Sequence, residues 1–206
     1  IVLGTAIVDM YAMCGVLGKA REVFEKLPMR NNITWNVLIS GYVRYGLNDE
    51  ALHCFFQMRN EGHSPDVITF VCLCKACGSL RFLQMAEDIH SEVRQRGLLE
   101  KNVVLGTALV DMYSKCGMLE KAQEVFEQLP VRNVGSWNAL IAGYAQNGLG
   151  DEALKCFKQM QDARILPDAV TYVCILKACA IVGSLDIGKD IDVEVRKRGL
   201  LRKNIV

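Results

Sequence analysis

The sequence predicts an all-α protein, a right-handed α-solenoid superhelix of six helix-turn-helix hairpins. Two observations predict it. Residues 1–102 recur without a gap as residues 103–204, and more than half of the aligned positions are identical. Self-similarity at a fixed period is the signature of stacked structural units. Within each 102-residue block, apolar residues keep helical spacing, and Gly or Pro interrupts them where helices should end.

The first unit of each block has 31 residues, at 1–31 and again at 103–133. Apolar residues at helical spacing predict its first helix: Leu3, Ala6, Ile7, Met10, Tyr11 and Cys14. Gly15 then supplies a left-handed stop. A second group predicts a second helix before Pro28: Leu17, Ala20, Phe24 and Leu27. This spacing is typical of a helical hairpin.

The second unit has 35 residues, at 32–66 and 134–168. Its first helix is predicted by Trp35, Leu38, Ile39, Tyr42 and Val43, and Gly46 ends it. The next helix is predicted by Ala51, Cys54, Phe55 and Met58, and Gly62 and Pro65 end it. We expect Trp35 and its equivalent Trp137 to pack in the core, because they share the helical spacing of the leucines beside them.

The third unit has 36 residues, at 67–102 and 169–204, and residues 205–206 would begin a further motif. Its two helices are predicted by Phe70, Leu73, Cys74 and Cys77, then by Leu83, Ala86, Ile89 and Val93. Short β-prone runs lie only where first helices should begin, so no sheet is expected. Because one hairpin cannot hide both of its faces, the hairpins should stack, with their first helices lining a concave surface.

Composition sets few limits on partners. The 24 Lys and Arg residues nearly balance the 23 Asp and Glu residues, so the net charge of +1 creates no strong field for a polyanion. No apolar run approaches the ~18 residues that span a bilayer, so no membrane association is expected. No signal peptide opens the sequence, and we expect the chain to be a fragment without its targeting segment.

The nine cysteines do not predict a metal site or disulfides. Cys72-x-Cys74-x-x-Cys77 has suggestive spacing, but Leu176 stands at the position equivalent to Cys74 in the second block. We expect buried, reduced thiols, including Cys14 and Cys116, which occupy apolar positions. The three histidines are not repeated in the second block, and no catalytic motif is present. The sequence therefore predicts no enzyme activity and no cofactor.

Three segments carry a family resemblance: GTALVDMYSKCGMLEKAQEVFEQLPVRN (Gly106–Asn133), SWNALIAGYAQNGLGDEALKCFKQMQ (Ser136–Gln161) and VTYVCILKACAIVGSLDIGKDI (Val170–Ile191). In these residues the chain resembles the pentatricopeptide repeat family, in the plant class of alternating short, standard and long motifs. The resemblance covers nearly every residue. It implies that each motif reads one base of single-stranded RNA through its fifth and last residues.

The resemblance carries these pairs onto numbered positions. The short motifs present Thr5 with Asn31 and Thr107 with Asn133; the standard motifs present Asn36 with Asp66 and Asn138 with Asp168. The long motifs present Val71 with Asn102 and Val173 with Asn204. Valine cannot hydrogen-bond a base edge, so the long motifs should read weakly or not at all. Taken alone, Thr, Asn and Asp near helix starts are more typical of helix caps.

The chemistry of the pairs agrees with the bases that the resemblance assigns. Uracil presents a ring N–H donor beside a carbonyl acceptor, which an Asn amide matches. Adenine presents a ring-nitrogen acceptor beside an amino donor, which a Thr hydroxyl and an Asn carbonyl match. Thr/Asn pairs should read adenine and Asn/Asp pairs uracil. The predicted target, with 5′ to 3′ following the chain, is A-U-N-A-U-N.

The resemblance also implies that the second residue of each motif packs against the base faces. Those residues are Val2, Ile33, Ile68, Val104 and Val170, and Gly135 departs from the pattern. It implies as well a chloroplast or mitochondrial protein that guides RNA editing or processing.

The alternative function is a protein-binding scaffold, since tetratricopeptide arrays use similar hairpins. The two functions need not exclude each other, because the resemblance makes the long motifs docking sites for organelle editing-cofactor proteins.

Overall fold

The computed structural model describes residues 2–202, which form twelve α-helices and one short 3₁₀ turn, with no strand among them. The helices are α1 (Val2–Met13), α2 (Leu17–Glu25), α3 (Asn32–Arg44), α4 (Asn48–Asn60), α5 (Val67–Leu80), α6 (Leu83–Gln95), α7 (Val103–Lys115), α8 (Leu119–Gln128), α9 (Val134–Gln146), α10 (Gly150–Asp162), α11 (Ala169–Val182) and α12 (Leu185–Lys197). The predicted all-α fold class is confirmed.

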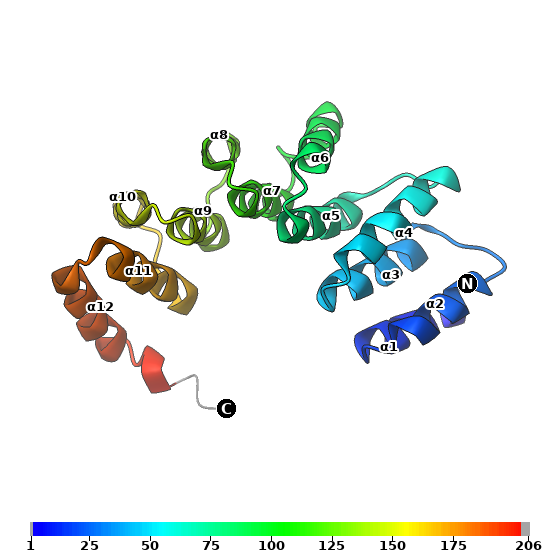
Figure 1. Cartoon of the computed structure of the whole chain (residues 1–206), viewed down its shortest axis with the longest axis horizontal. Coiled ribbons are helices and arrows are strands. Elements are labelled where there is room, and N and C mark those ends of the chain that lie inside the picture. The colour runs from blue at the N-terminus through cyan, green and yellow to red at the C-terminus, as the bar shows by residue number, and fades with distance from the viewer. Residues whose placement is uncertain (1, 203–206) are drawn as a thin grey trace.

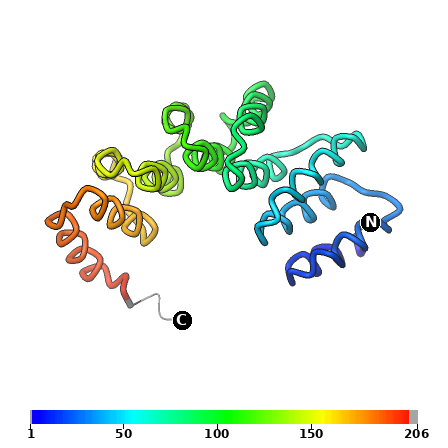
Figure 2. The backbone as a smooth tube through the Cα atoms, viewed as in Figure 1, coloured from blue at the N-terminus to red at the C-terminus, as the bar shows by residue number. Residues whose placement is uncertain are grey.

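The helices stack in chain order along an open arc, with α1 and α12 at its opposite ends (Figure 1). Each odd-numbered helix packs on its own partner and on the next odd-numbered helix, from α1 on α3 to α9 on α11. The tube in Figure 2 shows α5, α7, α9 and α11 on the inner side of the arc, with α6, α8, α10 and α12 outside. The first helices of these four hairpins therefore line the inner side, as the sequence predicts.

The aromatic core repeats with the sequence. Trp35 is fully buried and Trp137 nearly so, and each ring meets the edge of a phenylalanine. The ring centroids lie 4.5 Å apart for Trp35 and Phe24 and 4.6 Å apart for Trp137 and Phe126. The predicted core position of both tryptophans is confirmed.

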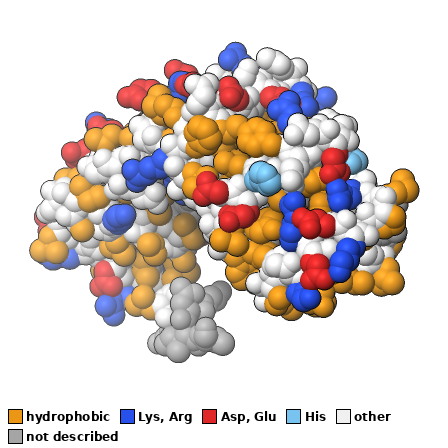
Figure 3. Space-filling view, turned by 45° about the vertical axis from the view of Figure 1, so that its right-hand side comes forward, with side chains coloured by type: hydrophobic (Ala, Val, Ile, Leu, Met, Phe, Trp, Pro, Cys, Tyr) orange, Lys and Arg blue, Asp and Glu red, His pale blue; other side chains and the backbone are white. Residues whose placement is uncertain are grey.

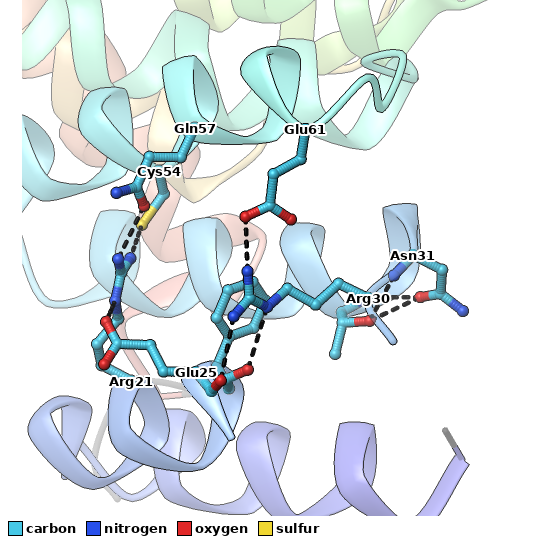
Figure 4. A network of polar contacts seen from close by, with 9 residues as sticks. Arg21, Glu25, Arg30, Asn31, Cys54, Gln57 and Glu61 are labelled. Carbon is cyan, nitrogen blue, oxygen red and sulfur yellow. Dashed lines mark hydrogen bonds and ion pairs between the residues drawn. The ribbon is translucent and has the colours of Figure 1, made fainter. Parts of the chain in front are cut away.

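Two arginines tie the outer side of the first hairpin to the second (Figure 4). Arg21 donates to Gln57 Oε1 at 2.8 Å, and Arg30 forms an ion pair with Glu61 at 2.6 Å. Arg30 also stacks on the Phe24 ring and donates to the Phe24 carbonyl, so it closes the end of α2. Elsewhere on the visible surface acidic and basic side chains are interspersed, in keeping with the small net charge (Figure 3).

The prediction of buried thiols is wrong for Cys14, which is exposed, whereas Cys116 is half-buried. The cause is position in the stack. Cys116 follows α7, which packs on α5, and its sulfur lies 3.9 Å from the Cys77 carbonyl oxygen. Cys14 follows α1, which is the first of the described helices and has no described helix before it to pack against.

Most of the other cysteines are buried as predicted, and burial raises the pKa of the Cys54 thiol to about 11. These thiols therefore stay protonated at neutral pH. No described helix combines the length and apolar character needed to cross a membrane.

Two helix ends hold an arginine in a backbone conformation that favours glycine. Arg81 has φ +53° and Arg164 has φ +57°, while the equivalent residues of the other block are Gly183 (φ +77°) and Gly62 (φ +80°). The Gly15 stop, with φ +77°, is also in this region, as predicted. A left-handed conformation is unfavourable for a residue with a Cβ atom. Each block therefore contains one helix end where an arginine is strained, and the equivalent position of the other block is a glycine without that strain.

Replacing Arg164 by Gly should stabilise the protein. Arg164 is exposed, and we expect Arg164→Gly to raise the free energy of unfolding by about 1 kcal/mol, measured by urea denaturation. The matched control is Gly62→Arg, which has open space around it and should lower the free energy of unfolding by a similar amount. If both substitutions raise, or both lower, the free energy of unfolding, backbone strain does not explain their effect.

Candidate nucleic-acid interface

Asn36 and Asp66 form a direct pair between two neighbouring hairpins. Asn36 lies in the first turns of α3, and Asp66 is the residue just before α5. The Asn36 Nδ2 group donates to Asp66 Oδ2 at 2.8 Å. The equivalent pair in the second block repeats the contact, with Asn138 Nδ2 donating to Asp168 Oδ1 at 3.0 Å. The fifth and last residues of the standard motifs thus lie side by side in both blocks.

A threonine three residues further on completes each pair. The Thr69 hydroxyl donates to Asn36 Oδ1 at 2.6 Å, and Thr171 donates to Asn138 Oδ1 at the same distance. Both threonines are fully buried. Since Asp66 accepts from the amide N–H and Thr69 donates to the amide carbonyl, the Asn36 amide is held in one orientation.

Asp66 also caps α5. Its Oδ1 accepts from the Thr69 backbone N–H at 3.0 Å, while its own N–H donates to the Thr69 hydroxyl oxygen at 3.1 Å, which makes a reciprocal capping box. Asp168 and Thr171 form the same box at α11. Capping and pairing are therefore not alternatives, since Asp66 uses one oxygen for each.

The paired amides keep unused hydrogen-bonding capacity. An Asn side chain has two N–H donors and two carbonyl lone pairs, and Asn36 uses one of each within the protein. Asn36 is 6% exposed and Asn138 is 9% exposed, so little of either amide faces solvent. One donor and one acceptor remain for a ligand that reaches them.

The carboxylate of Asp168 is kept ionised. Burial would raise its pKa, but hydrogen bonds from the Thr171 backbone N–H, the Asn138 amide and the Thr171 hydroxyl outweigh burial and hold the pKa below its usual value. An ionised carboxylate can only accept hydrogen bonds, so it fixes which end of the Asn138 amide faces it.

The short-motif residues Thr107 and Asn133 lie close together without a bond of the Asn36–Asp66 kind. A Cβ atom placed on Gly135 would lie 3.3 Å from Asn133 Oδ1 and 3.9 Å from Thr107 Cγ2. Thr107 Oγ1 donates to the Val103 carbonyl at 2.9 Å, and Asn133 Oδ1 accepts from the Ser136 N–H at 2.9 Å. These two side chains therefore share one side of the stack, and Asn133 also caps α9.

In the first block, Asn31 caps α3 and Thr5 lies half-exposed in α1. Asn31 Oδ1 accepts from the Thr34 N–H at 3.0 Å, in a capping box like that of Asp66. Thr34 therefore forms the same reciprocal capping box with Asn31 that Thr69 forms with Asp66.

The long motifs differ from the other two. Val71 is half-buried against the core and Val173 is 67% exposed. Asn102 caps α7 by accepting from the Leu105 N–H at 2.9 Å. Asn204, like residues 205–206, lies outside the described residues. No polar group stands at the fifth position of either long motif.

The predicted stacking residues form a regular row of exposed apolar side chains. Each lies at the start of an odd-numbered helix and is exposed: Val2 (86% exposed), Ile33 (64%), Ile68 (58%), Val104 (65%) and Val170 (56%). Gly135 interrupts the row at α9. The row places apolar surface beside the first turns that carry the polar pairs.

The buried threonines are the site residues that sequence reasoning missed. The spacing Asp66-x-x-Thr69 and Asp168-x-x-Thr171 resembles a capping box, and that signal predicts a threonine bonded to the aspartate. The bond from each threonine to an asparagine of the preceding hairpin is not local and has no such signal.

Comparison with known proteins adds to this geometry. The chain matches the PPR repeat family over residues 30–79 and 132–181, and a PPR repeat over residues 107–134. A putative pentatricopeptide repeat-containing protein of Arabidopsis thaliana is 40% identical over 188 residues, which is 91% of this chain and 23% of that protein. Two relatives named as mitochondrial and chloroplastic, also from Arabidopsis thaliana, are 40% and 38% identical over 93% and 90% of this chain. The chain spans about a quarter of the length of these relatives, 23–30%.

Solved structures show the same architecture. The maize pentatricopeptide repeat protein PPR10 is similar with a TM-score of 0.73 and 26% identity, over 95% of this chain and 29% of that chain. PPR10 in complex with an 18-nucleotide psaJ RNA element has a TM-score of 0.77 at 18% identity, over 92% of this chain and 29% of that chain. From the matched repeats, the relatives and the stacked hairpins together, the chain belongs to the pentatricopeptide repeat family.

Proposed function

We propose that this chain is a single-stranded RNA-binding module in which each short and standard motif reads one base, with the preferred order A-U-N-A-U-N. The observation that carries the proposal is the threonine-held Asn/Asp pair, present as Asn36 with Asp66 and again as Asn138 with Asp168. The RNA-bound structure of PPR10, which has the same fold, supports RNA as the ligand.

The fixed amide accounts for a choice of uracil over cytosine. An Asn36 amide with Nδ2 toward Asp66 and Oδ1 toward Thr69 offers its remaining donor and acceptor in a fixed order. Uracil presents N3–H and O4, which match that order, whereas cytosine presents N3 and an amino group, which reverse it. Turning the amide to suit cytosine would set its carbonyl against the Asp66 carboxylate.

The short motifs offer a different pattern that suits adenine. Thr107 supplies a hydroxyl and Asn133 an amide beside it, and both have capacity beyond the bonds they make within the protein. The exposed row from Val2 to Val170 supplies apolar surface against base faces, which is favourable for any base.

The proposal extends to the motif class, the cellular compartment and the role of the longer protein. The unit lengths indicate the class of alternating short, standard and long motifs, and the mitochondrial and chloroplastic relatives favour an organelle. We infer that the chain binds RNA without catalysis, and that RNA editing or processing is the work of a longer protein of which such a module is one part. Structural neighbours include the PPR domain of Arabidopsis thaliana protein-only RNase P 1 in complex with tRNA.

The long motifs remain candidates for protein contacts. Val173 is 67% exposed and carries no group that hydrogen-bonds a base. A pull-down with an organelle editing-cofactor protein, compared for the wild type and Val173→Asp, separates this role from RNA binding.

The RNA target is tested by electrophoretic mobility shift. The chain should bind A-U-C-A-U-C within a neutral flanking sequence about tenfold more tightly than a scrambled RNA of the same composition, which corresponds to roughly 1.4 kcal/mol. Indistinguishable affinities would end the proposed base preference.

An exchange of pairs should move the preference at one chosen base. Asn36→Thr with Asp66→Asn gives the standard motif the pair of a short motif, so the second base should change from uracil to adenine by about three- to tenfold in affinity. The matched control is Asn138→Thr with Asp168→Asn, which should change only the fifth base. A preference that does not follow the altered block contradicts the proposed reading.

Removing one threonine hydroxyl should loosen one uracil-reading amide. Thr69→Val keeps the shape but loses the bonds to Asn36 and Asp66, so it should lower the free energy of unfolding by about 1–2 kcal/mol and reduce discrimination of uracil from cytosine at the second base only. Competition binding with single-base RNA variants measures this. Thr171→Val should act on the fifth base alone, and equal loss at both bases would contradict the mechanism.

A further inference from the structure

The two short motifs end in the same residue, but the helix that follows binds that residue differently in the two blocks. Asn31 is followed three residues later by Thr34, and Asn133 by Ser136. Thr34 and Ser136 are fully buried, and each donates its backbone N–H to the asparagine side-chain oxygen, at 3.0 Å and 2.9 Å. Their hydroxyl groups then bond to different partners, which changes what each asparagine can offer to a ligand.

The Thr34 hydroxyl bonds to the side chain of Asn31. It donates to Asn31 Oδ1 at 2.7 Å and accepts from the Asn31 backbone N–H at 3.1 Å, which completes the capping box (Figure 4). An amide oxygen has two lone pairs. The N–H and the hydroxyl of Thr34 occupy both lone pairs of Asn31 Oδ1, so the Asn31 amide has only N–H donors left for a ligand.

The Ser136 hydroxyl bonds to the backbone instead. It donates to the Asn133 backbone carbonyl at 2.9 Å, and no reciprocal capping box forms. Serine lacks the Cβ methyl group that restricts the χ1 angle of threonine, so its hydroxyl can point elsewhere. Among the described residues, Asn133 Oδ1 accepts one hydrogen bond, from the Ser136 N–H, and one lone pair remains.

Gly135 leaves that lone pair uncovered. A Cβ atom on Gly135 would lie 3.3 Å from Asn133 Oδ1, closer than an ordinary van der Waals contact. The equivalent residue of the first block is Ile33, which carries a Cβ atom. Asn133 is exposed, whereas Asn31 is half-buried. The two short motifs therefore have the same residue types at their fifth and last positions but do not present the same hydrogen-bonding groups.

We propose that the third residue of the following helix, Thr34 or Ser136, is a further specificity-determining residue of each short motif. This inference rests on the proposed base reading. The 6-amino group of adenine donates a hydrogen bond and requires an acceptor. Asn133 Oδ1 can accept it, whereas Thr34 leaves no acceptor on the Asn31 amide. The fourth base of A-U-N-A-U-N is therefore read strictly as adenine, and the first base is read less strictly.

An RNA that lacks one amino group tests this difference. Purine ribonucleoside differs from adenosine only in lacking the 6-amino group, so it isolates one hydrogen bond while the ring can still stack. Competition binding compares A-U-C-A-U-C with RNAs that carry purine at the first or the fourth base. Purine at the fourth base should weaken binding about three- to tenfold, and purine at the first base less than about twofold.

Two reciprocal variants should move the sensitivity to purine between the two motifs. Thr34→Val keeps the shape and frees one lone pair of Asn31 Oδ1, so purine at the first base should now weaken binding about threefold. Ser136→Thr favours a capping box with Asn133, so purine at the fourth base should now weaken binding less than about twofold. Each variant is compared with the wild type at a single base, so the position of the motif in the array does not affect the result.

A control variant removes a hydroxyl from the same helix at a different place. Ser40 in α3 donates to the Val37 carbonyl at 3.0 Å, and Ser40→Ala should leave both purine effects as in the wild type. Uracil preference at the second and fifth bases should also stay unchanged in every variant. A thermal melt confirms that each variant is folded. Ser136→Thr keeps a hydroxyl, so it tests the proposal even if Thr34→Val lowers stability.

The outcomes separate this inference from the base reading on which it rests. A purine effect confined to the fourth base, lost in Ser136→Thr and gained at the first base in Thr34→Val, supports it. If adenine is preferred to uracil at both bases but purine weakens binding equally at both, or neither variant changes the purine effect, this inference alone is wrong. If adenine is not preferred to uracil at either base, the base reading fails and this inference fails with it.

Discussion

The structure depends on one constraint, the burial of each first helix between the first helices before and after it. Leu105, Leu109 and Met112 show what this constraint requires, since all three are fully buried in α7, between α5 and α9. In a solenoid each unit contacts only its neighbours, so the stability of the array is a sum over units and the contacts between them. Cys116, which follows α7, is half-buried beside α5 in this arrangement.

The same stacking also builds the candidate site. The Asn36–Asp66–Thr69 group takes one residue from α3 and two from the start of α5, so it forms only when successive hairpins are in register. Asp66 contributes to the stability of α5 as a cap and holds the Asn36 amide with its other oxygen. Stability and the proposed recognition thus depend on the same residue, which is why a local cap signal alone cannot reveal the site.

The sequence predicts the fold well because its signals are local and repeated. Apolar spacing and Gly or Pro breaks predict all the helical hairpins, and the tryptophans lie in the core as expected. The sequence could not predict contacts between residues far apart in the chain, or a backbone conformation that no glycine signals. The bond from Thr171 to Asn138 spans 33 residues, and the left-handed conformation of Arg81 stands at a position where the sequence has no glycine to signal it. The role of each pair in reading a base stays a prediction that the RNA experiments test.

The tryptophan cores have a consequence for how the protein can be observed. The chain contains two tryptophans, Trp35 and Trp137, one in each block and both against a phenylalanine edge. Because the two tryptophans have similar surroundings, the fluorescence of each one reports on the folding of its own block. Because a stacked array need not unfold as one cooperative unit, single Trp→Phe variants would follow each half of the chain separately. Divergent melting of the two signals would give the energetic coupling across the junction between α5 and α7.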